Sequence, residues 1–475
     1  MKKKSLMIYI LTALILTAAL LVSGGCNGGS DEKKKAGDAE SFKVTYATSE
    51  DMAAYDVSMD KQIDNIVAAE TDADALGGWG WVVKQMAWME AIGQGGYYSA
   101  GGLSSINLSY WTVNAFGQLT KADAAVFVPH NVWGSAKVPI VAIQHPTEVL
   151  RKNSPSKLVD KFGYNITDPA QAQMHLAALI ARMGYIVVMA DYLGMGENTD
   201  THPYCHELLA NSVRDAISAA STLDVPYRVF PPSVWDKKKV MLMGFSEGGY
   251  ATMVTAKKLQ ADGEFPVTAV AALDGPYSLS GTMHDVMVSA DKDFSAPYFL
   301  PYVLNGYSSV YGDKIPELKF GYSVRNDVSG YRDYPGALVA AMDGSHDADY
   351  INDIMKKPFL PDNYDGPRTI LSKEFLALLN DRESVVCKTL GANDSFAGWT
   401  PSMPLKMFHH VSDDLVPIGN MTEAKAAFDA AKAKFVEVES FEDYVDIGDS
   451  WHVKAFLIAF LRGFIWLDYY GYGNR

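Results

Sequence analysis

The chain has 475 residues, of which 48% are hydrophobic and 20% are charged, a composition typical of a globular protein with a large core. It has 41 basic and 56 acidic residues, so its surface repels phosphate groups and a nucleic-acid-binding function is not expected. Three cysteines are too few for disulfides to be the main source of stability. The length allows two or three domains, but α/β enzymes often use this much chain on one elaborated domain.

The N-terminus has the features of a bacterial lipoprotein signal. Three lysines at residues 2–4 precede an apolar run over 6–22 and then small residues, which predicts a secretory signal peptide over 1–25. Cys26 follows directly and would become the lipidated first residue, although a serine stands where the usual pattern has a leucine three residues earlier. The alternative is an uncleaved anchor helix, and both interpretations place the protein in the cell envelope, anchored to a membrane outside the cytoplasm. Residues 26–41 contain few apolar side chains and are expected to form a flexible tether.

Beyond the tether, apolar runs alternate with helical patterns. Runs without polar alternation predict strands buried on both faces, at 139–143, 185–190, 240–243 and 267–273, and further strands are predicted at 405–408 and 435–441. Apolar residues at helical spacing predict helices at 168–183, 206–223 and 420–434 and one from 453 onward. Another helix follows the glycine-rich turn after the strand at 240–243 and ends at about residue 259. Buried strands separated by helices predict an open, mostly parallel α/β sheet with a helical layer on each face, built from residues 42–274 and 401–475.

Residues 275–400 do not show this alternation of strands and helices. The segment is rich in Tyr, Phe and Pro and contains short helical patterns, such as the one at 373–390. Because it lies between two sheet strands, it is expected to be an inserted helical cap over the carboxyl edge of the sheet, where α/β sheets bind ligands. A second independent domain is the alternative. Nearer the N-terminus, 106–113 and 124–128 are β-like, and the aromatic residues of the Gly- and Trp-rich stretch at 79–88 are expected to pack in the core.

A Gly-Phe-Ser-Glu-Gly motif at 244–248 follows the third predicted strand and precedes a helix. Glycine two residues before and two residues after the serine leaves room for a crossing chain, so the turn can be tight and strained. This turn would raise Ser246 to the sheet edge, at a helix N-terminus that favours developing negative charge. Ser246 is therefore the predicted nucleophile, and the alternative is an ordinary Gly-rich start of a helix.

A serine hydroxyl needs a base to remove its proton, and the base needs an acid to orient it. In α/β enzymes whose nucleophile lies on such a turn, the chain order is Ser, acid, His. His452 lies after the last predicted strand and just before the terminal helix, which is the place for the base. Asp413 precedes Val416 by three residues, as in the Asp-x-x-Val-Pro turn of many enzymes with this arrangement. Asp414 is the alternative acid; if Asp413 is catalytic, Asp414 would cap a helix or be solvated.

An oxyanion hole requires two backbone N–H donors. The residue after the nucleophile, Glu247, should supply one. The loop after the strand at 139–143 should supply the other, and Thr147 is the candidate because Pro146 has no N–H. The carboxyl group of Glu247 could shape the leaving-group side of the site or bind a substrate amine.

Two further groups of residues invite alternative interpretations. Cys205 and Cys387 could pair in an oxidising compartment, although two buried free thiols are the favoured interpretation. His202, Cys205 and His206 invite a metal-site interpretation, but no second ligand cluster lies nearby, and a loop entering a helix explains them.

Taken together, these motifs resemble the α/β-hydrolase superfamily, most closely its secretory-lipase-like branch, which includes bacterial lipoproteins. The resemblance rests on Gln-His-Pro-Thr at 144–147, Asp-Tyr-Leu-Gly-Met-Gly at 191–196, the glycine-rich turn at 244–249, Asp-Asp-Leu-Val-Pro at 413–417, and His452. It covers about residues 107–470. Two departures from the pattern are Pro146 and His410, each at a position where the family usually has glycine.

The resemblance implies the α/β-hydrolase fold with a cap between strands six and seven, a Ser246/Asp413/His452 triad and no cofactor. It implies a serine esterase or lipase that acts on a small-molecule or lipid ester. One alternative is a serine exopeptidase of the same fold, which would need a carboxylate or an arginine cluster to bind a free peptide end. Another is a non-catalytic, surface-binding lipoprotein. The presence of Ser, Asp and His in the right order argues against this second alternative.

Overall fold

A computed structural model describes residues 22–25, 34–47, 49–95, 102–130, 137–161, 164–223, 235–320, 334–357 and 364–473. Cys26 and most of the predicted signal peptide lie outside these residues. Within the described ranges, no helix is both long enough and apolar enough to cross a membrane.

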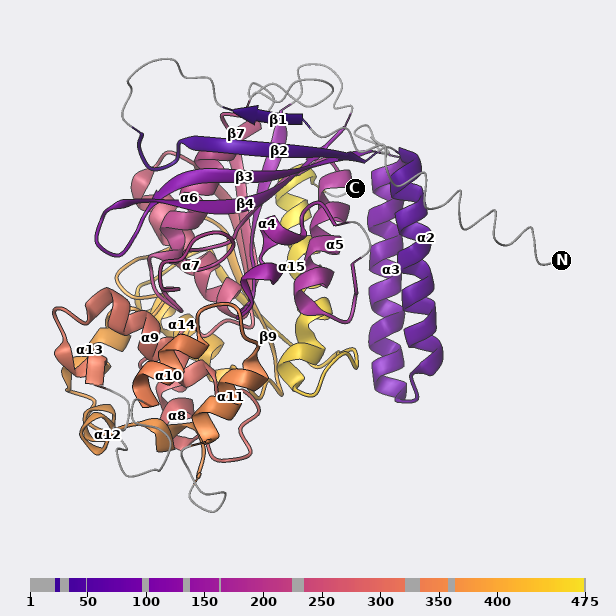
Figure 1. The fold of residues 1–475 in the computed structure, drawn as a ribbon. Coiled ribbons are helices and arrows are strands. Elements are labelled where there is room, and N and C mark those ends of the chain that lie inside the picture. The colour runs from indigo at the N-terminus through magenta and orange to yellow at the C-terminus, as the bar shows by residue number, and fades with distance from the viewer. Residues whose placement is uncertain are drawn as a thin grey trace, which may run out of the picture.

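The described strands belong to one sheet with the order β1-β2-β3-β4-β6-β5-β7-β8-β9-β10 (Figure 1). Strands β6, β5, β7, β8, β9 and β10 run parallel, whereas β1 to β4 are antiparallel and β4 pairs antiparallel with β6. Counted from β3, β8 and β9 are the sixth and seventh strands. The strands are β1 (Val22–Gly25), β2 (Ala39–Ala47), β3 (Leu103–Val113), β4 (Leu119–Pro129), β5 (Val138–Gln144), β6 (Ile186–Ala190), β7 (Trp235–Phe245), β8 (Val267–Leu273), β9 (Leu405–His410) and β10 (Val436–Phe441).

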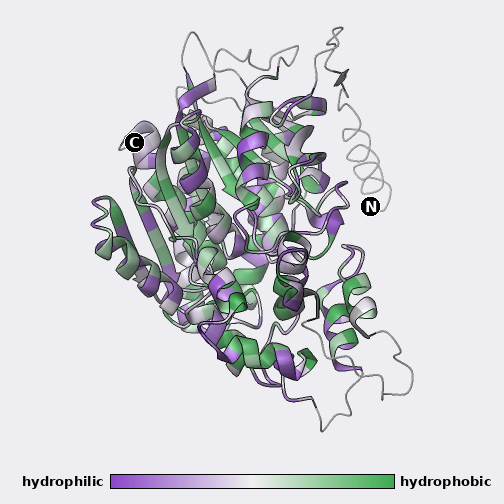
Figure 2. Cartoon of the chain, turned by 90° about the vertical axis from the view of Figure 1, so that its left-hand side faces the viewer, coloured by the Kyte–Doolittle hydropathy of each residue, from purple (hydrophilic) through white to green (hydrophobic). Residues whose placement is uncertain are grey.

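Helices cover both faces of the parallel part, as the continuous apolar strands predict. In β5, Ile140 and Ala142 pack into one apolar cluster, and Val141 and Ile143 pack into the other, so both faces of the strand are buried. Figure 2 shows that the central strands are hydrophobic along most of their length. The covering helices are α6 (Leu209–Ala220) and α7 (Glu247–Asp262) on the first face, with α5 (Pro169–Arg182) and α15 (Trp451–Tyr472) on the second. The short helix α4 (Pro155–Leu158) precedes α5, and α14 (Gly419–Ala430) lies between β9 and β10.

The N-terminal boundary of the sheet differs from the predicted one. Strand β2 begins at Ala39, within the segment expected to be a tether, because Ala39 packs into the same apolar cluster as Phe42 and Val44. Strand β1 lies inside the segment predicted as a signal peptide and pairs with β2.

Two N-terminal helices, α2 (Ser49–Ala69) and α3 (Ala73–Gly95), were not predicted. They lie side by side at one edge of the molecule (Figure 1). Glycines at 77, 78 and 80 interrupt the helical pattern, but Gly78 is required by close packing, since a Cβ atom there would lie 1.8 Å from the carbonyl oxygen of Tyr444. Trp79 is fully buried in the core, and Trp81 and Trp88 are partly buried and pack against the same apolar cluster, so the aromatic residues of this stretch serve packing as expected.

A helical insertion separates β8 from β9, at the predicted place. Figure 1 shows its helices gathered at the end of the molecule opposite β1. The predicted helix at 373–390 is two helices with a break at Asp381. The inserted helices are α8 (Thr282–Ser289), α9 (Phe299–Tyr311), α10 (Tyr334–Ala341), α11 (Ala348–Lys356), α12 (Lys373–Asn380) and α13 (Val385–Ala392).

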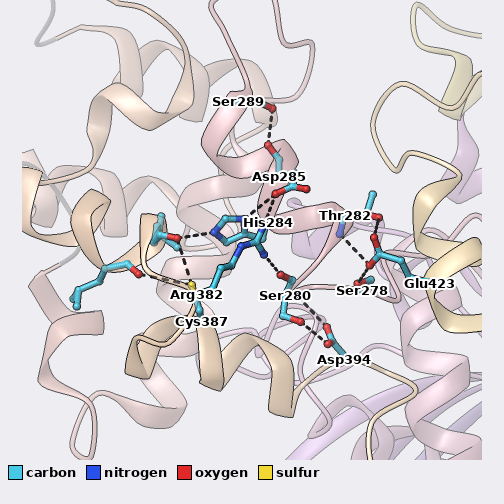
Figure 3. A network of polar contacts seen from close by, with 12 residues as sticks. Ser278, Ser280, Thr282, His284, Asp285, Ser289, Arg382, Cys387, Asp394 and Glu423 are labelled. Carbon is cyan, nitrogen blue, oxygen red and sulfur yellow. Dashed lines mark hydrogen bonds and ion pairs between the residues drawn. The ribbon is translucent and has the colours of Figure 1, made fainter. Parts of the chain in front are cut away.

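A polar network fixes the place where the insertion leaves and rejoins the sheet (Figure 3). The backbone N–H and the hydroxyl of Ser280, near the start of the insertion, donate to the carboxylate of Asp394, near its end, over 2.9 and 2.6 Å. The carboxylate of Glu423, on α14, accepts hydrogen bonds from Ser278 and Thr282. The two ends of the insertion are therefore joined to each other and to the core.

Candidate active site

The predicted nucleophile lies on a strained turn between β7 and α7. Ser246 has φ 60° and ψ −125°, a conformation that L-residues rarely adopt. A Cβ atom on Gly248 would lie 2.1 Å from the carbonyl oxygen of Gln144, and one on Gly244 would lie 2.4 Å from the carbonyl oxygen of Gly248. The Ser246 N–H donates to the carbonyl oxygen of Leu273 over 2.9 Å. The two glycines are thus required by the crossing of β5 and α7, and the turn is held from the β8 side.

The structure brings the predicted acid and base together. His452 Nδ1 lies 2.6 Å from Asp413 Oδ2, and both side chains are buried. The other carboxylate oxygen of Asp413 accepts the backbone N–H groups of Leu415 and Val416, over 3.0 and 2.8 Å. Burial acts to raise the pKa of Asp413, but the His452 imidazole outweighs it and holds this pKa below its usual value. Asp413 is therefore placed as an ionised group that orients the imidazole.

The neighbouring carboxylate, Asp414, has a different partner. Its Oδ1 accepts the backbone N–H of His452 over 3.2 Å, at the start of α15. Of the two candidate acids, Asp413 thus contacts the imidazole, and Asp414 binds a free N–H at the helix N-terminus.

The second imidazole nitrogen of His452 is buried beside the nucleophile turn. The ring lies 4.7 Å from the ring of Phe245, the residue before Ser246. His452 Nε2 has no hydrogen-bond partner among the described residues, so the structure contains no bond from it to the Ser246 hydroxyl. Catalytic hydrogen bonds of this kind often form only when substrate is bound.

The two predicted oxyanion donors belong to segments that touch. The chain at Gln144, just before the loop of Thr147, lies against the first turn of α7, which begins at Glu247. Two side chains fix Gln144 there, because Gln173 donates to its carbonyl oxygen over 3.2 Å and Thr252 donates to its side-chain oxygen over 2.6 Å. The hydroxyl of Thr147 lies 3.0 Å from that of Tyr204.

The Glu247 side chain does not face solvent. It is fully buried, and its Oε1 lies 2.7 Å from Nε2 of His202. An exposed carboxyl group that could bind a substrate amine is therefore not present at this position. His202 and His206 also do not form a common metal site, since His206 Nε2 contacts the hydroxyl of Tyr311.

Asp274, which directly follows β8, is a site residue that the sequence analysis did not identify. It is fully buried, has φ 43°, and accepts the backbone N–H of His410 over 2.7 Å. Burial, followed by the negative charge of Asp413, raises the pKa of Asp274 well above its ordinary value, which favours the protonated form of this carboxyl group. A polar residue at the carboxyl end of a buried strand was the available signal.

Asp274, His409 and Asp413 have potential ligand atoms within 4.8 Å of one another. Some of their polar atoms have protein partners: Asp274 accepts the backbone N–H of His410, and His409 Nε2 lies 2.7 Å from the carbonyl oxygen of Val416. His409 Nε2 therefore carries a proton, because a carbonyl oxygen can only accept.

Ser246 also lines a narrow cavity of about 50 Å³ whose other walls are almost entirely apolar. The insertion supplies most of these walls. They include Leu279, Met283, Met287, Phe299, Leu300 and Val303. Cys205 also lines this cavity, whereas Cys387 lies in α13, and both are free, buried thiols.

No protein-family model matches the chain, and no curated protein matches it. Solved structures do match. A protein from Legionella pneumophila, described as a candidate hydrolase, is 26% identical with a TM-score of 0.63, over 79% of this chain and 90% of the other. The rice cell wall degrading esterase LipA from Xanthomonas oryzae is 21% identical with a TM-score of 0.62, over 91% of this chain and 97% of the other.

Proposed function

We propose that this chain, which has the α/β-hydrolase fold, is a serine hydrolase that cleaves carboxylic esters. The observation that carries the proposal is the buried Asp413–His452 pair beside a strained turn that presents Ser246 to an apolar cavity. The sequence order of the three residues agrees with that of α/β-hydrolase triads.

The protonation of the pair follows from its partners. An ionised Asp413 carboxylate only accepts hydrogen bonds, so His452 Nδ1 carries the proton and Nε2 has a free lone pair. Nε2 can then take the proton of Ser246 as its oxygen attacks the ester carbonyl, and later return it to the leaving alcohol. The backbone N–H groups of Glu247 and Thr147 would stabilise the oxyanion. Water, activated by His452, would release the acyl group from Ser246.

The apolar cavity supports an ester with an apolar acyl group. Aliphatic and aromatic side chains of the insertion form its walls, and burying a methylene group there is favourable by about 0.8 kcal/mol. The peptidase alternative has less support, because the carboxylate nearest to the nucleophile in sequence is buried and paired with His202.

The test is hydrolysis by the full chain, in detergent, of p-nitrophenyl esters of increasing acyl length and of an aminoacyl p-nitroanilide. We expect hydrolysis of the esters, and we expect Ser246→Ala to abolish it. Ser212→Ala is the matched control, since Ser212 is another fully buried serine, on α6. Hydrolysis of the anilide alone would favour the exopeptidase, and ester hydrolysis by Ser246→Ala at the parent rate would overturn the proposal.

We also propose that the protein is lipid-anchored in the cell envelope through Cys26. The support is the order of basic, apolar and small residues that precedes this cysteine. Metabolic labelling with a fatty acid should mark the parent chain and leave Cys26→Ser unlabelled; labelling of both would contradict the assignment.

A further inference from the structure

A buried ion pair lies directly behind the nucleophile. Glu247 follows Ser246, and its side chain has no exposed surface. One carboxylate oxygen lies 2.7 Å from His202 Nε2, and the other has no hydrogen-bond partner among the described residues. His202 is thus the polar side chain that the structure provides for this carboxylate.

The partners of His202 determine its charge. Its Nδ1 lies 2.9 Å from the carbonyl oxygen of Leu193, which can only accept, and its Nε2 faces the carboxylate of Glu247. The carbonyl oxygen requires a proton on Nδ1, and an ionised Glu247 carboxylate requires a proton on Nε2, so the ring beside an ionised Glu247 is an imidazolium. Burial opposes this charge, but the Glu247 carboxylate outweighs burial and raises the pKa of His202 above its ordinary value.

This charge matters because of where Glu247 lies. Its backbone N–H is the proposed donor to the oxyanion, and its carboxylate is in the same residue. In a buried site, an uncompensated carboxylate would repel the negative charge that develops on the ester oxygen. A site that keeps a glutamate here therefore needs a positive charge beside it.

Through Tyr192, the same histidine is also connected to the other segment of the proposed oxyanion hole. The His202 ring stacks on Tyr192 with centroids 5.9 Å apart, and Tyr192 stacks on His145 with centroids 4.1 Å apart. The Tyr192 hydroxyl donates to the carbonyl oxygen of His145 over 3.3 Å, two residues before Thr147. The ring stack thus connects the first turn of α7 to the loop that carries the second proposed donor.

We propose that His202 is a positioning residue that neutralises the Glu247 carboxylate and holds both sides of the oxyanion hole. This inference rests on the proposed ester hydrolysis. It assigns His202 no contact with substrate, and it predicts that the charge of His202 is needed only because Glu247 is charged.

A double-mutant cycle on the full chain tests this relation. His202→Gln keeps an N–H donor for Glu247 and removes the positive charge, and Glu247→Gln removes the negative charge and keeps the backbone N–H. We expect His202→Gln to lower kcat on a short-chain p-nitrophenyl ester by about 30-fold, with KM changed by less than about threefold. Glu247→Gln alone should lower kcat by about threefold. The double variant should recover to within about fivefold of the parent, because it carries no unbalanced charge.

The proposal would be overturned if the two substitutions lowered kcat independently of each other. A double variant with a lower kcat than His202→Gln would mean that the two charges do not compensate each other. His206→Asn is the matched control, a buried histidine four residues away that faces Tyr311 rather than a carboxylate, and its kcat should change by less than twofold. If His202→Gln fails to fold, the double variant and Glu247→Gln still test the proposal. A loss in kcat above 30-fold in Glu247→Gln would show that the carboxylate itself is needed, which contradicts the proposal. Absence of ester hydrolysis by the parent chain would instead refute the proposed function.

Discussion

The carboxyl edge of the sheet and the helical insertion are built in different ways. At the sheet edge, backbone meets backbone: Gly248 lies against Gln144, and the Ser246 N–H donates to Leu273. In the insertion, the walls that face Ser246 are side chains such as Met283 and Leu300. Polar contacts of the insertion include those at its two ends, where Ser280 binds Asp394 and Ser278 binds Glu423 of the core (Figure 3).

This difference separates two tasks. Backbone contacts cannot relax without moving a strand, so the sheet edge can hold reacting groups within a few tenths of an ångström. Side chains such as Met adapt to different shapes, so the insertion can accept different acyl groups without disturbing the triad. We therefore expect changes at the sheet edge to affect kcat for every ester, and changes in the insertion to affect the choice among esters.

The largest effect is expected from the acid of the proposed triad. Asp413→Asn removes the charge that orients His452 and stabilises its protonated form, and kcat should fall by about 10⁴-fold for short and long esters alike. Asp414→Asn is the matched control; it weakens one hydrogen bond to a backbone N–H and should lower kcat by less than about threefold. Equal losses in the two variants would mean that the acid has been wrongly assigned.

The next effect concerns the backbone crossing. Gly248→Ala places a Cβ atom 2.1 Å from the carbonyl oxygen of Gln144, so β5 or α7 must shift. We expect a loss of about 100-fold in kcat and of about 2 kcal/mol in the free energy of unfolding, measured by urea denaturation. Gly80→Ala, on α3 with no atom near the new Cβ, should leave kcat unchanged and raise stability by about 0.5 kcal/mol. An unimpaired Gly248→Ala would show that the sheet edge is more adaptable than proposed.

A smaller and selective effect is expected in the insertion. Val303→Phe narrows the apolar cavity, so kcat/KM for a long-chain ester should fall by about tenfold while that for an acetyl ester changes by less than twofold. Val385→Phe, at an exposed position on α13, is the control and should change neither value. An equal loss in kcat/KM for both esters would mean that Val303 affects catalysis in general, as residues of the sheet edge do, and not the choice among esters.

The smallest kinetic effect is expected at Asp274. Asparagine keeps an oxygen that can accept the backbone N–H of His410, so Asp274→Asn should lower kcat by less than about threefold. The pKa of Asp274 is higher in the folded chain than in the unfolded chain, where it is about 3.9. The free energy of unfolding of the parent therefore falls as pH rises above about 3.9, whereas the variant lacks this loss. The free energy of unfolding of the variant, relative to the parent, should therefore increase from pH 4 to pH 7. A constant difference would mean that Asp274 is ionised in the folded chain.

Much of the sheet edge could be predicted from the sequence because its signals are local. The apolar runs of β5, β7 and β8 are each a continuous stretch of sequence, and Gly244 and Gly248 lie two residues from Ser246. The contacts of Asp274 with His410 and of His202 with Glu247 could not be predicted, since each joins residues distant in sequence. Helix α3 was missed because glycines such as Gly78, required by packing against Tyr444, resemble loop residues.

The central claim is that Ser246 is the nucleophile of an acyl-enzyme, and covalent labelling tests it most directly. The full chain would be treated with an alkyl fluorophosphonate, and the modified peptide would be identified by mass spectrometry. The account predicts stoichiometric modification of the peptide that contains Ser246, no modification in Ser246→Ala, and modification slowed by at least about 100-fold in Asp413→Asn. Modification of a different residue, or ester hydrolysis that survives complete modification of Ser246, would contradict it.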